Sequence, residues 1–377
     1  MNMPFAVSQE NQNFSTFIEY LNQIYDPREQ KKIKYPLCTI IFLAICGLLG
    51  GANNFVEIAD YCKSRKPWLK KYFGITKIPS HDTFNRVFGL MLPMDFNHWV
   101  IKSISYLLFK ESKVINIDGK VIESYSSSDP FVAVRAWCSE NKAVLAQVRV
   151  HYGDNEITTI PRLLDITDIK NKVVTIDAIG AQTAIVEQII NKGGDYLIAL
   201  KGNQGTLHKD VSLFMNSIID KELTDINYDY AESFSRGHGR IETRRCWTTS
   251  SIQWLEQSDR WKSLSSITTI ESTVQRKNGK TSVNRRHFIS SLTPNANYQL
   301  KTSRSHWSIE NQLHWHLDVD FNEDKSTIKG YFASQNMSSL RSIAISLLSL
   351  FSPEIGFKRK RQIVNRRPST LKKILLK

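Results

Sequence analysis

The chain has 377 residues and carries 50 lysines and arginines against 36 aspartates and glutamates, which gives a formal net charge of +14. Its length indicates two or three domains, and a hydrophobic fraction of 41% supplies a sizeable core and excludes a disordered chain. The positive charge favours a polyanionic partner, nucleic acid first, with charge that only aids solubility or an anionic membrane surface as the alternatives. No apolar run approaches the roughly 20 residues of a membrane span.

The first part of the chain, residues 1–110, is expected to be a helical N-terminal domain. Apolar residues recur at helical spacing over 14–25, 36–49 and 55–73, and a further short helix follows Ser80, which suits the N-cap position. A helix, a glycine turn and a second helix are typical of a helix-turn-helix that binds DNA ends, and an ordinary helical bundle is the alternative.

Residues 113–201 change to an alternation of strands and helices. Strand patterns cover 113–122, 132–138, 143–150, 172–179 and 196–200, and helical patterns cover 156–169 and 182–192. The order β-β-β-α-β-α-β predicts an antiparallel meander followed by β-α units. We therefore expect an α/β fold with a mixed sheet and flanking helices.

The rest of the chain returns to helices after a second β-rich stretch. A helical pattern over 203–221 precedes a mainly β segment at about 225–298, and helices follow over 300–317 and 337–351. The basic C-terminal tail, 351–377, contains nine basic residues and one acid and supplies +8 of the net charge. We expect domain boundaries near residues 110 and 350, and a tail that adds salt-sensitive DNA affinity.

Two aspartates follow apolar strand patterns. Asp118 stands in the run INIDGK, and Asp177 stands in the run VVTIDAIG, just before a turn of small residues. A carboxylate in a strand is costly unless it is paired, bound to a metal or exposed at the strand end. Ligands of open α/β sheets bind at the carboxyl ends of strands, so both carboxylates are expected at one sheet edge. Their repulsion favours a divalent cation between them, Mg²⁺ or Mn²⁺.

A third carboxylate, Glu310, lies in a helical pattern with unusual neighbours. His306, Glu310 and His314 share one helix face at i, i+4 and i+8, and Trp307 and Asn311 flank that face. We expect Glu310 to complete the carboxylate set. A solvated helix face and a His-Glu-His transition-metal site are the alternatives.

The acidic run after this helix resembles the start of a calcium-binding EF-hand loop. It has Glu323 where that loop needs glycine and Lys329 where it needs a bidentate glutamate. A calcium site is therefore not expected, and Glu323 and Asp324 are interpreted as supporting acids near the site or at a helix end.

Six motifs in a fixed order carry a resemblance to one protein family. They are INIDGK (115–120), NEITTIPRLLDITDIK (155–170), TIDAIGAQ (175–182), GGDYLIALKGNQGTLHKD (193–210), RGHGRIETRR (236–245) and HWSIENQLHWHLDVDFNEDKS (306–326). On these motifs the chain resembles bacterial insertion-sequence transposases of the DDE class, in the branch that includes the H-repeat-associated proteins. The resemblance covers nearly the whole chain.

The resemblance implies a ribonuclease H-like fold with a helical N-terminal domain, a catalytic domain at 111–350 and a β-rich insertion before the last catalytic helix. It also implies that Asp118, Asp177 and Glu310 form the catalytic, metal-binding triad. Related transposases carry a Tyr-x2-Arg-x3-Glu-x6-Lys signature, whose positions here hold Ser303, His306, Glu310 and Leu317, so only the glutamate is kept.

We hypothesise that the triad holds two Mg²⁺ ions, roughly 3.5–4 Å apart, and that this site cuts one DNA strand at a transposon end and joins the liberated 3′-OH to target DNA. Candidate DNA-binding residues are Lys201, Asn203, Arg240, Arg304, His306, Trp307, Asn311 and His314. The tryptophans Trp247, Trp254 and Trp261 are candidates for stacking on a base, with core packing as the alternative.

The expected partners are terminal inverted repeats, target DNA and a second copy of the chain in a homodimer, without a membrane. Five widely spaced cysteines without a CxxC pair are typical of a reducing compartment, here the bacterial cytoplasm. Two alternatives stay open: a ribonuclease H-like nuclease that cuts without strand transfer, and a catalytically silent DNA-binding repressor.

Overall fold

The computed structural model describes residues 12–105, 113–123, 130–237, 239–352 and 354–375. The chain divides into two compact units. Unit 1 comprises Met1–Glu111, Gly119–His151 and Glu310–Lys377, and unit 2 comprises Ser112–Asp118 and Tyr152–Ile309. The N-terminal helices thus share a unit with the chain from Glu310 onward. Among the described residues, no helix is both long and apolar enough to cross a membrane.

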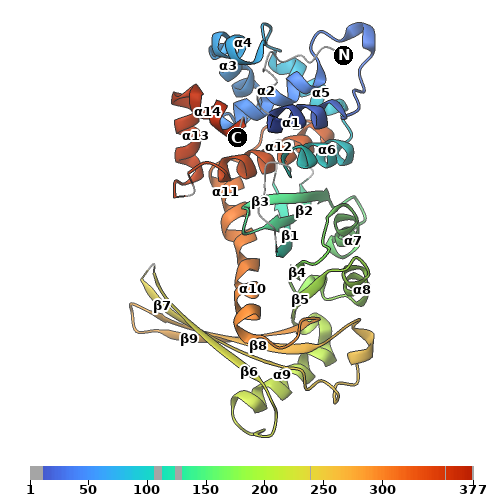
Figure 1. Cartoon of the computed structure of the whole chain (residues 1–377), viewed down its shortest axis with the longest axis vertical. Coiled ribbons are helices and arrows are strands. Elements are labelled where there is room, and N and C mark those ends of the chain that lie inside the picture. The colour runs from blue at the N-terminus through green and yellow to red at the C-terminus, as the bar shows by residue number, and fades with distance from the viewer. Residues whose placement is uncertain (1–11, 106–112, 124–129, 238, 353, 376–377) are drawn as a thin grey trace. The chain divides into compact units, whose positions relative to one another are not determined.

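Unit 1 is mainly helical. Its N-terminal helices are α1 (Gln12–Asn22), α2 (Leu37–Leu49), α3 (Phe55–Ser64), α4 (Lys66–Phe73), α5 (His81–Leu90) and α6 (Pro93–Ser105). Every residue of α2 is buried, and the later helix α12 (Tyr331–Ser349) packs against α2, α5 and α6 (Figure 1). The predicted cap is confirmed, because Ser80 accepts a hydrogen bond from the Thr83 amide at 3.3 Å. The helices that the sequence predicted around 14–25 and 36–49 are likewise present.

The single helix predicted over 55–73 is two helices, α3 and α4, which meet at Arg65. Pro67 lies in the first turn of α4, where its missing N–H breaks no helical hydrogen bond. Proline is favoured at that position and disfavoured inside a helix, so it starts a new helix instead of continuing α3. Gly74, with a φ of 69°, ends α4 in the left-handed conformation.

The C-terminal segment forms two helices, α13 (Phe357–Arg366) and α14 (Pro368–Leu375), which pack in unit 1. Arg361 is buried and donates to the carbonyl oxygens of Leu48 at 3.0 Å and Ala52 at 2.7 Å. Lys360 is also buried and donates to the Leu348 carbonyl at 2.8 Å. Two of the basic residues in this segment therefore hold the fold together and are not exposed to a partner.

Unit 2 contains most of a mixed sheet, and strand β1 (Val114–Ile122) has residues in both units. The strands of unit 2 lie in the order β1-β4-β5-β9-β8-β7-β6, in which β1, β4 (Val173–Ile176) and β5 (Asp195–Leu200) are parallel. Helices α7 (Glu156–Ile166) and α8 (Thr183–Asn191) provide the crossovers between them (Figure 1). In unit 1, β2 (Phe131–Cys138) and β3 (Ala143–Arg149) form the predicted antiparallel hairpin. The predicted mixed α/β architecture is confirmed.

The insertion expected at about 225–298 consists of four long antiparallel strands. They are β6 (Asp229–Gly237), β7 (Arg240–Thr249), β8 (Ser266–Arg276) and β9 (Thr281–Ser290), and β9 pairs with β5. Helix α9 (Gly205–Ile219) precedes them, and α10 (Ala296–Ser308) packs across β6, β7 and β8 and reaches β4 (Figure 1). The insertion thus extends the same sheet, and α10 leads the chain from it to Glu310.

Candidate carboxylate site

Asp118 and Asp177 follow paired residues on neighbouring parallel strands. Ile117 of β1 pairs in register with Ile176 of β4, so the two aspartates are the next residues on adjacent strands. Both side chains are half-buried. Residues that follow a paired position on adjacent parallel strands are neighbours in the backbone, so Asp118 and Asp177 lie at the same level of the sheet. The strand register is therefore compatible with the site that the sequence predicts at these two aspartates.

The loop after Asp177 is held by hydrogen bonds from a neighbouring turn. Asp177 Oδ1 accepts from the Ile179 amide at 3.0 Å and thereby caps the short helix η2 (Ala178–Gly180). The Asn203 side chain donates to the Ala178 carbonyl at 2.6 Å, and the Gln204 side chain donates to the Ala181 carbonyl. The amide group of Asn203, a candidate DNA contact, is therefore used to hold this loop.

Gly180 permits the close approach of this loop to β4. A Cβ added there would lie 2.2 Å from Ile176 Cγ2 and 2.9 Å from Ile176 Cβ. We expect Gly180→Ala to lower the free energy of unfolding by about 1–3 kcal/mol, because Ile176 is buried and cannot move away freely. Urea denaturation measures the effect. Gly89→Ala is a matched control, because a Cβ at Gly89 meets nothing within 4 Å. An unchanged stability for Gly180→Ala would contradict the packing described here.

Glu156, at the first turn of α7, is a further acid near Asp177 that the sequence reasoning did not single out. Burial raises the pKa of Glu156, and the negative charge of Asp177 raises it further. The Asn155–Thr158 capping box fixes this helix end, with Asn155 accepting from the Thr158 amide at 3.0 Å. The motif that begins NEIT could have indicated this acid, because Glu156 directly follows the capping residue Asn155 and so lies at the start of a helix.

His306, near the end of α10, fastens that helix to the strands of the aspartates. Its Nδ1 shares a hydrogen bond of 3.1 Å with Thr175 Oγ1, two residues before Asp177. Thr175 donates its own proton to Asn116 Oδ1 at 2.8 Å, and Ser305 also donates to that oxygen at 3.1 Å. These contacts dock the last turn of α10 against β1 and β4.

The same hydrogen bonds define the chemical form of His306. Burial lowers the pKa of His306 to about 4, Arg286 and Lys201 lower it as well, and Asp177 opposes them. The imidazole is therefore neutral at pH 7. Because the Thr175 proton goes to Asn116, Nδ1 carries the imidazole proton and Nε2 is an acceptor. An acceptor cannot donate to a phosphate, so this form favours a positioning role for His306.

Glu310 lies in a π-helical segment, η5 (Ile309–His314), and not in the continuous α-helix that the sequence predicted. Hydrogen bonds in a π-helix run from i to i+5, so the i, i+4, i+8 spacing does not keep three side chains on one face. Glu310 and Asn311 are exposed, whereas His314 is buried and inaccessible to DNA. Such π-helical segments occur frequently at functional sites. Glu310 is also the first residue of the C-terminal part of unit 1.

The cationic candidates are distributed over unit 2. Lys201 is exposed just after β5 and contributes positive charge at His306. Arg304 is exposed near Arg244, whose pKa is lowered by burial and by the Arg304 charge. Trp307 is covered by the Arg286 guanidinium, 4.3 Å from the ring centroid. Arg240 is exposed at the start of β7, and its charge also lowers the pKa of Arg244.

The three tryptophans of the insertion differ in exposure. Trp261 is buried in the core, which leaves it no surface for a base. Trp247 packs against Tyr230 at 5.3 Å between ring centroids, and Trp254 packs against Phe214 at 4.4 Å. Core packing, the alternative to base stacking, holds for Trp261.

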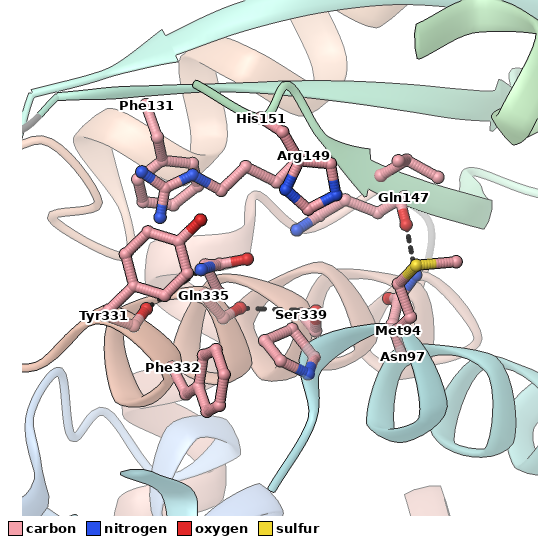
Figure 2. A pocket seen from close by; sticks show the side chains of 12 residues that line it. Met94, Asn97, Phe131, Gln147, Arg149, His151, Tyr331, Phe332, Gln335 and Ser339 are labelled. Atoms are coloured by element: carbon pink, nitrogen blue, oxygen red, sulfur yellow. Dashed lines mark hydrogen bonds between the residues drawn. The ribbon is translucent and has the colours of Figure 1, made fainter. Parts of the chain in front are cut away.

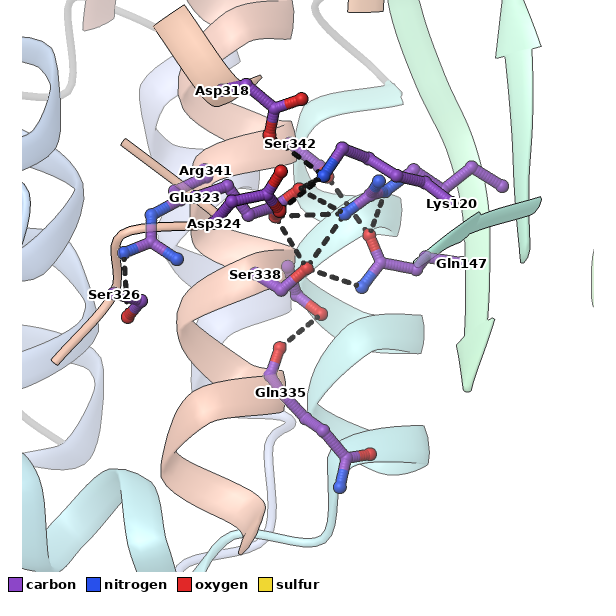
Figure 3. Close-up of polar contacts among 12 residues, drawn as sticks. Lys120, Gln147, Asp318, Glu323, Asp324, Ser326, Gln335, Ser338, Arg341 and Ser342 are labelled. Atoms are coloured by element: carbon purple, nitrogen blue, oxygen red, sulfur yellow. Dashed lines mark hydrogen bonds and ion pairs between the residues drawn. The ribbon is translucent and has the colours of Figure 1, made fainter. Parts of the chain in front are cut away.

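Lys120, two residues after Asp118, is buried in unit 1 beside two acids. Its Nζ lies 2.8 Å from Asp318 Oδ1 and 2.6 Å from Asp324 Oδ1 (Figure 3). Asp318 belongs to α11 (Trp315–Val319), which directly continues the segment of Glu310. Burial raises the pKa of Asp318 to about 6 and Asp324 adds to this, while Lys120 opposes it. The ion pairs fasten the end of β1 to the helical segment that carries Glu310.

A second, fully buried ion pair lies next to Lys120. Arg135 Nη2 of β2 donates to both Glu323 oxygens at 3.0 and 3.2 Å and to Ser338 Oγ at 2.9 Å, and neither charged side chain has exposed surface (Figure 3). Arg135 Nε donates to Gln147 Oε1 at 2.8 Å. Glu323 and Asp324 are thus paired with cationic side chains of the protein itself.

A small pocket in unit 1 has a volume of about 70 Å³ and is lined by Arg149 and its neighbours (Figure 2). The Arg149 guanidinium lies between two rings, 4.5 Å from the Phe131 centroid and 4.1 Å from the Tyr331 centroid. The stacked arginine joins β3 to the start of α12.

The oxygen donors here suit a hard divalent cation. Asp118 and Asp177 supply two neighbouring carboxylates, the ligand type that Mg²⁺ and Mn²⁺ prefer. Among the described residues, no group of three or more His, Cys, Asp or Glu side chains is arranged to hold a metal ion. The two aspartates therefore suit Mg²⁺ or Mn²⁺ as part of a metal site, and such a site requires at least one further oxygen ligand.

Two parts of the chain match models of known protein families. Residues 130–347 match the family described as "Transposase DDE domain", and residues 18–103 match "DDE_Tnp_1-associated". Asp177 and Glu310 lie inside the first match, and Asp118 precedes it.

Individual relatives agree with these matches. The chain is 34% identical to "Putative transposase YncI" of Escherichia coli O157:H7, over 93% of this chain and 92% of that protein. It is 33% identical to "H repeat-associated putative transposase YhhI" of Escherichia coli (strain K12), over 88% of this chain and 90% of that protein. A short protein named "Inactive transposase YbfQ", from the same strain, is 32% identical over 19% of this chain and 84% of its own length.

Proposed function

The chain belongs to the family of transposases with a DDE domain, and from that premise we propose that it cuts and joins DNA with a site formed by Asp118, Asp177 and Glu310. The observation that supports the proposal is the register of β1 and β4, in which Ile117 pairs with Ile176, the residues directly before the two aspartates. The antiparallel hairpin, the parallel strands and their crossover helices support a ribonuclease H-like fold for this part.

The contacts on either side of Glu310 support its role as the third carboxylate. Before it, His306 and Ser305 dock α10 on the strands of the aspartates. After it, Asp318 pairs with Lys120, two residues beyond Asp118. Each contact lies within one unit. The residues on both sides of Glu310 are therefore fixed by contacts within their own units, which supports the choice of this glutamate.

The residues of this site have distinct roles in the proposed reaction. Asp118, Asp177 and Glu310 would hold Mg²⁺ or Mn²⁺, which polarises the attacking oxygen and neutralises charge on the phosphate. Asn203 and Gln204 hold the loop of Asp177, and His306 holds α10. Lys201 and Arg304, both exposed, are the proposed phosphate contacts. The other proposed DNA contacts are likewise exposed, and they are Arg240, Trp307 and Asn311.

In the proposed cleavage, the oxygen of water attacks the phosphorus at the transposon end and the bond from phosphorus to the 3′ oxygen breaks. The products are a 3′-OH and a 5′-phosphate. In strand transfer, that 3′ oxygen attacks a target phosphorus and the target's own 3′ oxygen leaves as a hydroxyl. Both steps are phosphodiester exchanges that need no covalent protein intermediate. We propose that a homodimer carries them out on paired ends.

A DNA assay separates this proposal from its two alternatives. We expect the purified chain, with Mg²⁺, to nick a duplex that carries the inverted repeats flanking its gene and to join that end to a plasmid. Gel electrophoresis separates nicked from joined products. Nicks without joined products would indicate a nuclease, and binding without nicks would indicate a silent repressor.

A further inference from the structure

We propose that α4 and the C-terminal helices form one basic face that binds the phosphates of double-stranded DNA. This α4–α14 face consists of seven exposed cations: Lys66, Lys70, Lys71, Arg366, Arg367, Lys372 and Lys373. The inference rests on the proposed function in that DNA is the substrate, and it assigns a second contact surface for it in unit 1.

Two contacts bring these distant parts of the chain together. Arg65, at the start of α4, donates to the carbonyl oxygen of Asn365 and lies 3.4 Å from its side-chain oxygen. Lys71 and Lys372 approach the same Tyr72 ring, with Nζ atoms 5.4 and 4.8 Å from its centroid. The cations of α4 and those of α13 and α14 therefore lie on adjoining surfaces, and α13 and α14 lie on the same side of unit 1 as α2 and α3 (Figure 1).

The charge of this face is not balanced within the protein. None of the seven cations forms an ion pair with a carboxylate of the described residues, although Lys63 nearby pairs with Asp60 at 3.3 Å. Like charges brought this close repel each other and destabilise the free protein. A row of phosphates relieves the repulsion, and counterion release from DNA adds to the binding free energy.

Buried cations of the same segment keep the face rigid. Arg361 is hydrogen-bonded to the carbonyl oxygens of Leu48 and Ala52, and Lys360 to that of Leu348. The segment is therefore two fixed helices and not a free tail. Cations on fixed helices lose less conformational entropy on binding than those on a flexible chain.

The distribution of apolar residues favours DNA over a membrane surface. A helix that binds the membrane interface exposes an apolar face, which inserts among the lipids. Here the apolar side chains of α13 and α14, such as Val364, Leu371 and Ile374, are buried in unit 1. None of the large exposed hydrophobic side chains of the described residues lies on α4, α13 or α14.

The test is the salt dependence of binding to a duplex of random sequence, measured by fluorescence anisotropy on the full chain. The variant replaces Lys70, Lys71, Lys372 and Lys373 with Gln, and the matched control replaces four exposed lysines elsewhere, Lys31, Lys34, Lys170 and Lys221. The logarithm of the binding constant falls as the logarithm of the salt concentration rises. We expect this slope to be less steep in the variant by about 3–4, because each lost phosphate contact removes about 0.9. The control should keep the wild-type slope.

Three outcomes are decisive. A wild-type slope in the variant, with a wild-type thermal transition, overturns the proposal even if the wild type cleaves transposon ends. A variant that instead loses binding only to phosphatidylserine vesicles also overturns it, in favour of a membrane surface. If the variant has a less steep slope but the wild type does not cleave transposon ends, the α4–α14 face is supported and only the proposed function is refuted.

Discussion

Asp118→Asn, Asp177→Asn and Glu310→Gln should each slow DNA strand cleavage by about 10³-fold or more, the scale on which loss of transition-state charge stabilisation acts. Each substitution keeps the shape of the side chain and removes one negative oxygen donor. None of the three side chains is buried, since Asp118 and Asp177 are half-buried and Glu310 is exposed, so we expect the variants to fold. Single-turnover cleavage of an end duplex measures the rate.

Binding of the same duplex should be largely unchanged in these variants, because the phosphate contacts come from cations and not from the triad. Asp259→Asn is the matched control, since Asp259 is an exposed acid of unit 2 outside the site. It should cleave at the wild-type rate. Retained cleavage in any triad variant would remove that residue from the proposed site.

Glu323→Leu should lower the free energy of unfolding by about 3–5 kcal/mol, the usual effect of removing one partner of a buried ion pair. Glu323 and Arg135 have no exposed side-chain surface, and Glu323 accepts from Arg135 and from Ser338 at 2.9 Å. The substitution leaves the Arg135 charge buried with only neutral partners. Urea denaturation of the purified variant gives the loss directly.

The double variant Arg135→Met with Glu323→Leu provides the control. It removes both charges, so most of the lost stability should return, because a buried pair replaced by apolar side chains is often neutral in stability. A single variant that loses less than about 1 kcal/mol would contradict the buried pair described here, since exposed pairs contribute no more than that.

Local patterns predicted most elements of the chain because those elements depend on neighbouring residues. The apolar run predicted α2, the residue type at position 80 predicted the helix cap, and the β-forming runs around Asp118 and before Asp177 predicted β1 and β4. The rule that ligands lie at the carboxyl ends of parallel strands led to the same two neighbouring strands, β1 and β4, whose register the structure shows.

Features that depend on distant residues could not be predicted. Lys120 and Asp324 form an ion pair across 204 positions, and no local pattern marks either as a partner. Arg65 meets Asn365 across 300 positions, so the basic segment could not be recognised as part of a folded unit. The π-helical turn at Glu310 could not be predicted either, because the spacing of side chains along a helix was interpreted with α-helical geometry.

Replacement of Mg²⁺ by Fe²⁺ tests most directly whether the three carboxylates form one site. Fe²⁺ with peroxide releases hydroxyl radicals that cut the polypeptide near the bound metal, and mass spectrometry locates the cuts. We expect cuts near Asp118, Asp177 and Glu310 together, all suppressed by excess Mg²⁺ and by Asp177→Asn. Cuts near the two aspartates without any near Glu310 would contradict a shared site and exclude this glutamate from it.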